Sequence, residues 1–279
     1  MDAEGESGMN ILLLNHYAGS DSYGMEFRPL YLSRELVKLG HQVTVIAADY
    51  SHLRARNPKI DHSFDEEYID GVRYVYIKTI KYHGNGIKRF LNIMNYLSAL
   101  KGNAAWIFDT YRPDIIVASS TYPYDVKAAR KIASFGENTK VCYEIHDIWP
   151  LSLIELYHLS PRNPYIMSLQ HAEKYAYQNA DMVISILPHV DRHIRELGFH
   201  DVPYVHIPNG VVTDEESFHS APESAVKAIA ELKKKGKFVL MYLGGFSKAN
   251  AIDDLMADAP LLPESVQLVL VGDGPLKAE

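Results

Sequence analysis

A histidine, an aspartate and a tryptophan lie close together in segment 144–150, as His146, Asp147 and Trp149. They follow the apolar run 140–145, which is typical of a buried strand. A histidine and a carboxylate at the end of a strand can transfer a proton or orient a reacting group, and Trp149 offers a flat apolar face with one N–H donor. Alternatively, Asp147 caps the next segment and His146 only packs. Because open parallel sheets bind ligands beyond the carboxyl ends of their strands, we favour a functional role.

A loop with two glycines, Gly19 and Gly24, follows the first apolar strand. It lacks the G-x-G-x-x-G spacing of dinucleotide-binding loops, so it either presents N–H groups to an anion or a hydroxyl-rich ligand or is a flexible turn. Glu26 and Arg28 open the next helix, where the carboxylate favours the dipole and the arginine opposes it. We therefore expect Arg28 to be held by a ligand or a carboxylate. Ser120, after another strand, suits sugar recognition or helix capping.

Metal and thiol chemistry are not indicated by the remaining candidates. His189 and His193 have the four-residue spacing of two metal ligands on a helix, but they lie outside an H-E-x-x-H motif and have no third ligand nearby in the sequence. We interpret them as a solvated helix face and predict no metal site. Cys142 lies in an apolar run and is interpreted as a small buried hydrophobic residue.

The elements that position these residues follow from the apolar pattern, in which strands and helices alternate. This alternation predicts an α/β fold with a doubly wound, Rossmann-like parallel sheet. The expected strands are 10–15, 42–47, 72–77, 114–118, 140–145, 182–186 and 204–207, and the expected helices are 30–39, 87–100, 125–135, 164–179 and 188–197. A helix at 225–235, a strand at 238–243, a helix at 249–257 and a strand at 266–271 then begin a second Rossmann-like unit.

Two domains are therefore predicted. Residues 9–212 form a complete N-terminal domain, and residues 213–279 contain a linker and the first part of a C-terminal domain. We expect the second domain to be truncated, because its last strand runs into a Gly-Pro turn as in the middle of an α/β domain. Residues 1–8 are polar and small, and we interpret them as a disordered leader or a cloning remnant.

Composition narrows the classes of function. The chain has 279 residues with 47% hydrophobic content, and its net charge of −7 argues against a broad nucleic-acid-binding surface. No apolar run approaches the ~20 residues of a membrane span, and no signal peptide is visible, so we predict a cytoplasmic protein. The amphipathic helix 87–100, with Lys81 and Lys88 near its start, is either an ordinary core helix or a surface that meets anionic lipid at the inner face of the cytoplasmic membrane.

Several motifs, in their order and spacing, resemble those of the retaining GT-B glycosyltransferases of family 4, particularly bacterial enzymes of surface-polysaccharide synthesis, such as that of lipopolysaccharide or capsule. The segments that carry the resemblance are 24–29, 39–45, 146–150, 207–211, 242–244 and 271–275. The resemblance implies two Rossmann-like domains that face each other across a cleft. The first would bind the acceptor and the second a nucleotide-activated sugar.

The resemblance also implies roles for individual residues. His146 matches the histidine that approaches the donor sugar, and Asp147 would hold this histidine or an acceptor hydroxyl. The acceptor side would be lined by Gly19, Gly24, Glu26, Arg28, Ser120 and Trp149, and the donor side by Gly244, Gly245, Lys248, Gly272, Asp273 and Gly274. No metal or other cofactor is expected, because positive charge and helix dipoles would stabilise the leaving diphosphate.

The chain departs from the family pattern at three points. Gly245 and Asn250 stand where an arginine and a lysine are usual, although Lys248 lies nearby and could substitute. Val212 stands where an aspartate commonly follows the Pro-Asn-Gly-Val run, and the E-x7-E segment would lie beyond Glu279. Because loss of the donor half removes most of the transition-state stabilisation, we expect this chain to be inactive alone.

We therefore predict that the full-length protein is a retaining hexosyltransferase of cell-surface polysaccharide synthesis. Its expected partners are a UDP- or GDP-sugar donor, a lipid-linked or glycan acceptor and an anionic membrane surface, without nucleic acid. Two alternatives remain open, a non-catalytic acceptor-binding fragment and a GT-B epimerase that acts on a nucleotide sugar.

Overall fold

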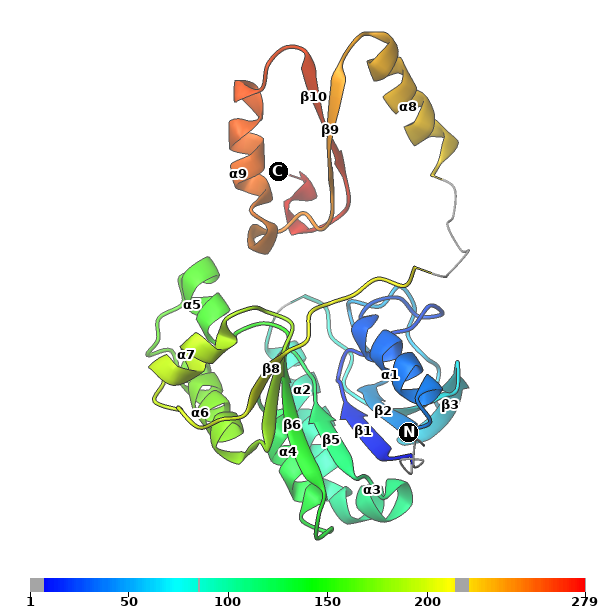
Figure 1. Ribbon diagram of the computed structural model, residues 1–279, viewed down its shortest axis with the longest axis vertical. Coiled ribbons are helices and arrows are strands. Elements are labelled where there is room, and N and C mark those ends of the chain that lie inside the picture. Colours follow the sequence, from blue (N-terminus) through cyan, green and yellow to red (C-terminus); the bar gives the residue numbers. More distant parts are fainter. Residues whose placement is uncertain (1–7, 85, 214–220, 279) are drawn as a thin grey trace, which may run out of the picture. The chain divides into compact units, whose positions relative to one another are not determined.

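The chain divides into two compact units, Met1–Gly210 and Val211–Glu279, here called unit 1 and unit 2 (Figure 1). The computed structural model describes residues 8–84, 86–213 and 221–278. Residues 1–7 of the expected leader and residues 214–220 of the expected linker lie outside the described residues. The two units are described separately below.

Unit 1 is built on an eight-stranded sheet with the order β3-β4-β2-β1-β5-β6-β7-β8. Its strands are β1 (Asn10–Leu14), β2 (Gln42–Ala48), β3 (Asp65–Ile69), β4 (Val72–Ile77), β5 (Ile115–Ala118), β6 (Lys140–Ile145), β7 (Met182–Ser185) and β8 (Tyr204–His206). Neighbouring strands run parallel except β3, which is antiparallel to β4. The chain order reverses between β1 and β5, and such a switch point opens a crevice beyond the carboxyl ends of the two strands.

Helices cover both faces of this sheet (Figure 1). They are α1 (Arg28–Lys38), α2 (Ile87–Gly102), α3 (Ala104–Tyr111), α4 (Asp125–Ala133), α5 (Leu151–Tyr157), α6 (Pro164–Asn179) and α7 (Val190–Glu196). In β1, Leu12 and Leu14 belong to a core that includes residues of α2, α3 and α4, whereas Ile11 and Leu13 belong to a second core that includes Leu30 of α1. A strand buried on both faces has a continuous apolar sequence. The predicted doubly wound α/β fold is confirmed.

Three elements escape prediction from the sequence, namely β3, α3 and α5. The five residues of β3 begin with three carboxylates, so they show no apolar alternation. This strand forms because its backbone pairs with β4 at the edge of the sheet. α3 follows α2 after the single residue Asn103, so the two apolar patterns run together in the sequence.

The predicted amphipathic helix 87–100 is buried only in part as α2. Leu97 and Leu100 are buried, but Ile87 is 79% exposed. The inward face includes polar Asn92 and Tyr96, which donate hydrogen bonds to the carbonyl oxygens of Ile80 and Ile46. Apolar spacing alone therefore does not identify the buried face of this helix. The exposed apolar side chains of its first turns are Ile87, Phe90 and Leu91.

Unit 2 contains α8 (Glu223–Lys234), β9 (Phe238–Leu243), α9 (Ile252–Asp258) and β10 (Val266–Val271). The strands β9 and β10 pair in parallel, so the two are joined by a crossover through α9. Short 3₁₀ helices lie at Lys248–Asn250, Ala259–Leu261 and Pro275–Ala278. In the described parts of both units, no helix has the length and apolar character needed to span a bilayer.

Candidate active site at the carboxyl ends of β5 and β6

The last residues of β5 and β6 bring three polar side chains together. β5 pairs with both β1 and β6, so Ser119, just after β5, lies beside the end of β6. Its hydroxyl lies 2.6 Å from Glu144 Oε2 and 3.1 Å from His146 Nε2. His146 Nε2 lies 2.9 Å from Glu144 Oε2. Glu144 and His146 are two residues apart on one strand end, so their side chains point to the same face of the sheet.

Arg28, the first residue of α1, contacts this cluster through Glu144. Its Nε and Nη2 lie 3.1 and 2.9 Å from Glu144 Oε1. The same guanidinium donates to the carbonyl oxygens of Ile207 and Pro208 and to Asn209 Oδ1, at 2.9, 3.1 and 3.0 Å. The expectation that a carboxylate holds this arginine is confirmed. Because its donors are bound to protein groups, Arg28 supports the site rather than lining the acceptor side as we predicted.

Glu26 lies on the opposite side of the imidazole from Glu144. Its Oε2 is 3.7 Å from His146 Nδ1, and its side chain is 19% exposed, against 3% for Glu144. Burial raises the pKa of Glu26, while the charge of His146 lowers it and that of Glu144 raises it. Of the two carboxylates beside His146, Glu26 is therefore the one that reaches solvent and binds a proton more readily.

Glu144 and His146 stabilise each other's charged forms. Burial alone would raise the pKa of Glu144, but the hydrogen bond and charge of His146, with Arg28 and Ser119, lower it to about 2. Burial alone would lower the pKa of His146, but the hydrogen bond and charge of Glu144, with the charge of Glu26, outweigh burial and raise it. The pair therefore favours a protonated imidazole beside an ionised Glu144.

Asp147 and Trp149 lie in the turn that leads into α5. Asp147 accepts hydrogen bonds from the Trp149 indole N–H, at 3.2 Å, and from the Ser152 hydroxyl. The histidine-holding role predicted for Asp147 is therefore taken by Glu144, because β6 already places that carboxylate against the ring. Trp149 is half-buried and packs against the core. Both donors to Asp147 belong to side chains, and α5 begins at Leu151 without a side-chain cap, so the alternative in which Asp147 caps the next segment does not describe these contacts.

The glycine loop after β1 is closed by its own hydrogen bonds. Gly19 N–H donates to the carbonyl oxygen of Glu26 at 2.8 Å, and Ser20 and Gly24 exchange two bonds of 3.0 and 2.7 Å. A Cβ on Gly19 would lie 1.8 Å from the Gly24 carbonyl oxygen, and Gly24 has a φ of +95°. The N–H groups of Gly19 and Gly24 are thus engaged inside the loop, and both glycines serve to deliver Glu26 to the site.

Ser120 points into unit 1. The Ser120 hydroxyl accepts a hydrogen bond from the backbone N–H of His16 at 3.1 Å. The backbone N–H of Ser120 donates to Asp125 Oδ2 at 2.9 Å. Asp125 is fully buried, and its Oδ1 has no hydrogen-bond partner among the residues that the structure describes. Burial raises the pKa of Asp125 to about 7 despite the hydrogen bonds from Ser120. Ser120 therefore joins β1, β5 and α4 beneath the site, and its hydroxyl does not cap α4, which begins without a side-chain cap.

In unit 2 the glycines predicted to bind the donor gather where β9 and β10 end. A Cβ on Gly272 would lie 1.8 Å from the Gly244 carbonyl oxygen, and one on Gly274 would lie 2.3 Å from that of Phe246. Phe246 N–H donates to the Asp273 carbonyl oxygen at 2.9 Å. The loops after the two strands therefore touch, and glycine is required because the backbones approach so closely.

Other polar groups of unit 2 surround these loops. The Gly245 carbonyl oxygen accepts from the Tyr242 hydroxyl at 2.9 Å and from Asn250 Nδ2 at 2.8 Å. Asn250, where the family resemblance expects a lysine, is thus used to fold the loop. Lys248 is exposed in its 3₁₀ helix, and Asp273 pairs with Lys277 at 3.4 Å. Lys248 is a cation placed after the carboxyl end of β9.

His193 is not part of a solvated helix face. Its Nε2 lies 2.8 Å from Oε1 of the buried Glu173, so it joins α7 to α6. His189 precedes α7 with a φ of +63°, so the two histidines do not share a helical turn. Among the residues that the structure describes, no group of three or more His, Cys, Asp or Glu side chains is arranged to hold a metal ion.

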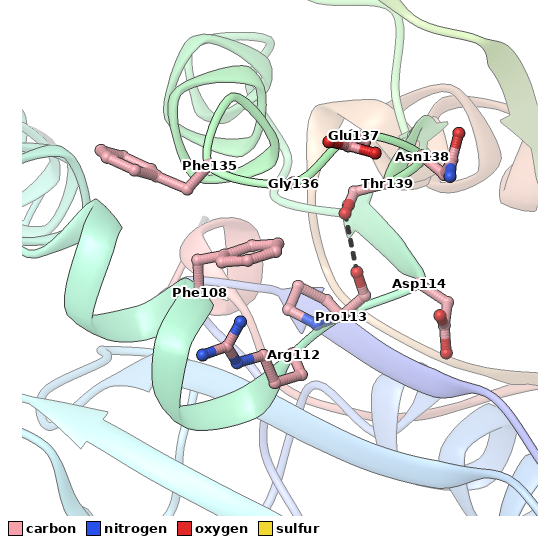
Figure 2. Close-up of a pocket in the computed structure, with 9 residues that line it drawn as sticks. All are labelled: Phe108, Arg112, Pro113, Asp114, Phe135, Gly136, Glu137, Asn138 and Thr139. Atoms are coloured by element: carbon pink, nitrogen blue, oxygen red, sulfur yellow. Dashed lines mark hydrogen bonds between the residues drawn. The ribbon is translucent and has the colours of Figure 1, made fainter.

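A cavity of about 390 Å³ lies at the opposite ends of the strands from the His146 cluster, where β5 and β6 begin (Figure 2). Its lining residues are Phe108, Arg112, Pro113, Asp114, Phe135, Gly136, Glu137, Asn138 and Thr139. Thr139 Oγ1 donates to the Pro113 carbonyl oxygen at 2.9 Å across its floor (Figure 2). Because ligands of such sheets bind at the carboxyl ends of the strands, this cavity is a weaker candidate than the His146 cluster.

The sequence did not single out Glu144 and Ser119, which contact His146, or Asp125, which lies beneath this cluster. A signal was present for Glu144, since it is the one carboxylate in the otherwise apolar strand 140–145. A charge buried in a strand requires a partner, and the partner here is His146 with Arg28. Asp125 had no such signal, because an acidic residue at a helix start is usual.

The sequence profile of glycosyltransferase family 4 matches residues 23–215, and no curated protein sequence matches the chain. Among known structures, the chain is similar to sucrose-phosphate synthase from Thermosynechococcus elongatus, with a TM-score of 0.62, 19% identity, and coverage of 94% of this chain and 62% of that one. It is also similar to HepE from Anabaena in complex with UDP and glucose, with a TM-score of 0.55, 14% identity, and coverage of 95% and 61%.

A third similar structure is α,α-trehalose 6-phosphate synthase from Burkholderia multivorans, with a TM-score of 0.53, 12% identity, and coverage of 95% of this chain and 64% of that one. At these identities the likeness concerns the fold, which is of the GT-B type. The chain spans about 61 to 64% of the length of these three proteins.

Proposed function

This chain belongs to glycosyltransferase family 4, and we propose that it serves the transfer of a hexose from a UDP- or GDP-sugar to a lipid-linked or glycan acceptor. The proposal includes retention at the anomeric carbon and a role in surface-polysaccharide synthesis at the inner face of the cytoplasmic membrane. The observation that carries it is the buried cluster of Glu144, His146 and Glu26, which lies at the carboxyl edge of the sheet and inside the matched stretch. The UDP and glucose in the HepE structure support a nucleotide-sugar donor.

In this proposal His146 hydrogen-bonds the donor sugar. Its Nε2 is bound to Glu144 and Ser119, so Nδ1, which faces Glu26 at 3.7 Å, is the nitrogen for a sugar hydroxyl. A hydroxyl both donates and accepts hydrogen bonds. A protonated Nδ1 beside a Glu26 oxygen offers one partner of each kind. Glu144 and Glu26 raise the pKa of His146 against the effect of burial, which favours the protonated ring in which Nδ1 is a donor.

The leaving diphosphate is assigned to the loops after β9 and β10, with Lys248 as the cation and without a metal or other cofactor. These loops can present backbone N–H groups to an anion, and a nearby cation lowers the free energy of the developing charge. On the acceptor side, Glu26 and Trp149 are the proposed contacts. Gly19, Gly24 and Ser120 shape the surrounding backbone.

The test compares the binding of UDP and UDP-glucose by isothermal titration calorimetry, repeated with UDP-N-acetylglucosamine and with GDP-mannose against GDP. The difference between the sugar nucleotide and the bare nucleotide isolates the contribution of the sugar. We expect His146→Gln to remove this difference, a change of about tenfold in affinity for one hydrogen bond to a charged group. His193→Gln is the matched control, because it also removes a histidine bonded to a buried glutamate, Glu173.

Each outcome of this test has a definite meaning. Equal losses in the two variants would refute the role of His146. Acceptor binding without any nucleotide affinity would favour the non-catalytic module. If an active preparation converts the nucleotide sugar into an epimer without acceptor, the protein is an epimerase.

We also propose that the exposed start of α2 meets an anionic membrane, which would bring a lipid-linked acceptor to unit 1. Ile87, Phe90 and Leu91 are 79, 36 and 45% exposed, and Lys81 and Lys88 are exposed nearby. Apolar side chains beside lysines suit the interface of anionic lipids, where each lysine contributes ~1 kcal/mol.

Vesicle sedimentation tests this surface with phosphatidylcholine vesicles that contain or lack phosphatidylglycerol. We expect Ile87→Glu to abolish binding to the anionic vesicles. The control is Leu39→Glu, since Leu39 is 73% exposed at the end of α1, away from this patch. Equal binding by wild type and Ile87→Glu would refute the proposal.

A further inference from the structure

We propose that Arg28 is a positioning residue that locks the Glu144–His146 pair to segment 207–209, the last part of unit 1 before the chain enters unit 2. This proposal rests on the proposed function only in taking His146 as the residue that hydrogen-bonds the donor sugar. Its structural basis is independent of any substrate.

The guanidinium of Arg28 has no N–H group left for a ligand. Arginine carries five N–H donors, and the structure provides five acceptor contacts for them. Nε and one Nη2 donor serve Glu144 Oε1, the other Nη2 donor serves the Ile207 carbonyl oxygen, and Nη1 serves the Pro208 carbonyl oxygen and Asn209 Oδ1. The side chain is only 10% exposed. Arg28 therefore joins two parts of the protein.

The two parts that it joins are far apart in sequence. Glu144 ends β6 in the middle of the sheet, whereas segment 207–209 follows the edge strand β8 and is exposed. Ile207 N–H donates to the carbonyl oxygen of Ser185 at 2.9 Å. The carbonyl oxygens of Ile207 and Pro208 accept hydrogen bonds from Arg28. The chain passes from unit 1 to unit 2 directly after this segment, at Gly210.

Glu144 transmits the effect of this connection to the imidazole. Its Oε1 binds Arg28, and its Oε2 binds His146 and Ser119. A movement of the segment that displaces Arg28 therefore changes the charge next to the carboxylate that holds His146. The charged and titratable groups that act on His146 from the surrounding elements are Glu144 from β6, Glu26 and Arg28 from the start of α1, and Asp125 from α4.

Only an arginine suits this position. A lysine has three donors on a single nitrogen and cannot serve the carboxylate and the three oxygens of the segment in one plane. Arg28→Lys therefore keeps the positive charge and breaks the connection. This separates the positioning role from a simple requirement for charge.

The first measurement is hydrogen exchange of peptides that cover residues 204–213. We expect Arg28→Lys and Glu144→Gln to speed exchange of the Ile207 amide about tenfold, the effect of losing about one charge-assisted hydrogen bond. Among the described residues Glu144 has no hydrogen bond to the segment, so faster exchange that is confined to these peptides, and absent from other peptides of unit 1, must pass through Arg28. Ser119→Ala is the control, because it removes a partner of Glu144 Oε2 and leaves the Arg28 contacts in place.

The second measurement is an NMR titration of His146, assigned by loss of its signal in His146→Gln. The charge of Arg28 lowers the pKa of His146, so Arg28→Gln, which removes that charge, is expected to raise it. A purely structural arginine would leave the titration unchanged. Near-wild-type exchange in both Arg28→Lys and Glu144→Gln, or an unmoved His146 titration, would overturn the proposal. Neither readout uses a substrate, so the proposed transfer reaction can fail while the connection stands.

Discussion

Replacing Glu144 by glutamine should destabilise unit 1 strongly at neutral pH and little in acid. Glutamine keeps the shape of the side chain and resembles its protonated form. It loses the charge that faces Arg28 and His146, whose nearest nitrogens lie at 2.9 Å. Because the Glu144 side chain is only 3% exposed, little water can reach these two side chains to compensate for the lost negative charge.

The size of the effect follows from the pKa. Burial opposes ionisation of Glu144, yet His146, Arg28 and Ser119 lower its pKa from 4.5 to about 2. At about 1.4 kcal/mol per pKa unit, the ionised side chain contributes about 3 kcal/mol to the free energy of unfolding. A lowered pKa means that this contribution is complete above pH 4.5 and is lost as the pH falls toward 2.

Tryptophan fluorescence in a urea titration measures this contribution. Both tryptophans, Trp106 and Trp149, lie in unit 1, so the signal reports the unfolding of that unit. We expect Glu144→Gln to lower the free energy of unfolding by about 3 kcal/mol at pH 7 and by clearly less at pH 3.

Glu26→Gln is the matched control, because Glu26 flanks the same imidazole from the other side at 3.7 Å. Burial raises the pKa of Glu26, so ionisation of this carboxyl opposes folding, and the glutamine variant should be as stable as wild type or more stable at pH 7. A loss of equal size at pH 7 and pH 3 for Glu144→Gln, or equal losses for the two variants, would refute this electrostatic account.

Three further predictions concern the surroundings of the site. Burial raises the pKa of Asp125 to about 7, so wild-type stability should fall as the pH rises from 3.8 to 7, by up to about 4 kcal/mol, and Asp125→Asn should flatten this slope in the same urea assay. Gly24→Ala should lower the melting temperature more than Gly40→Ala; both glycines have positive φ, but a Cβ at Gly24 would lie 2.9 Å from the Ala55 nitrogen and one at Gly40 would meet nothing within 4 Å. Cys142 is half-buried, and burial raises the pKa of its thiol, so alkylation at pH 8 should be slower in the native protein than in urea; equal rates would contradict this placement.

Part of the site could be inferred from local sequence because its members share one strand end. Glu144 and His146 are two residues apart, and the apolar strand before them marks the carboxyl edge where ligands bind. The roles of Asp147 and Arg28 could not be inferred in the same way. Asp147 is adjacent to the histidine in sequence, but its contacts are with Trp149 and Ser152. Asp147 lies in the turn after β6, where the chain has left the strand, so proximity in sequence was a poor guide there.

The sequence by itself determined the α/β class and most elements, because apolar side chains must repeat with the period of the strand or helix that buries them. The strands β4 and β6 and the helix α6 begin and end where the pattern predicted. Tertiary structure alone decided the edge strand β3, which depends on backbone pairing with β4, and the buried face of α2. It also decided that Arg28 meets Glu144 across 116 residues of chain. Such a contact depends on how helices and strands pack in three dimensions, and no periodicity in the sequence encodes it.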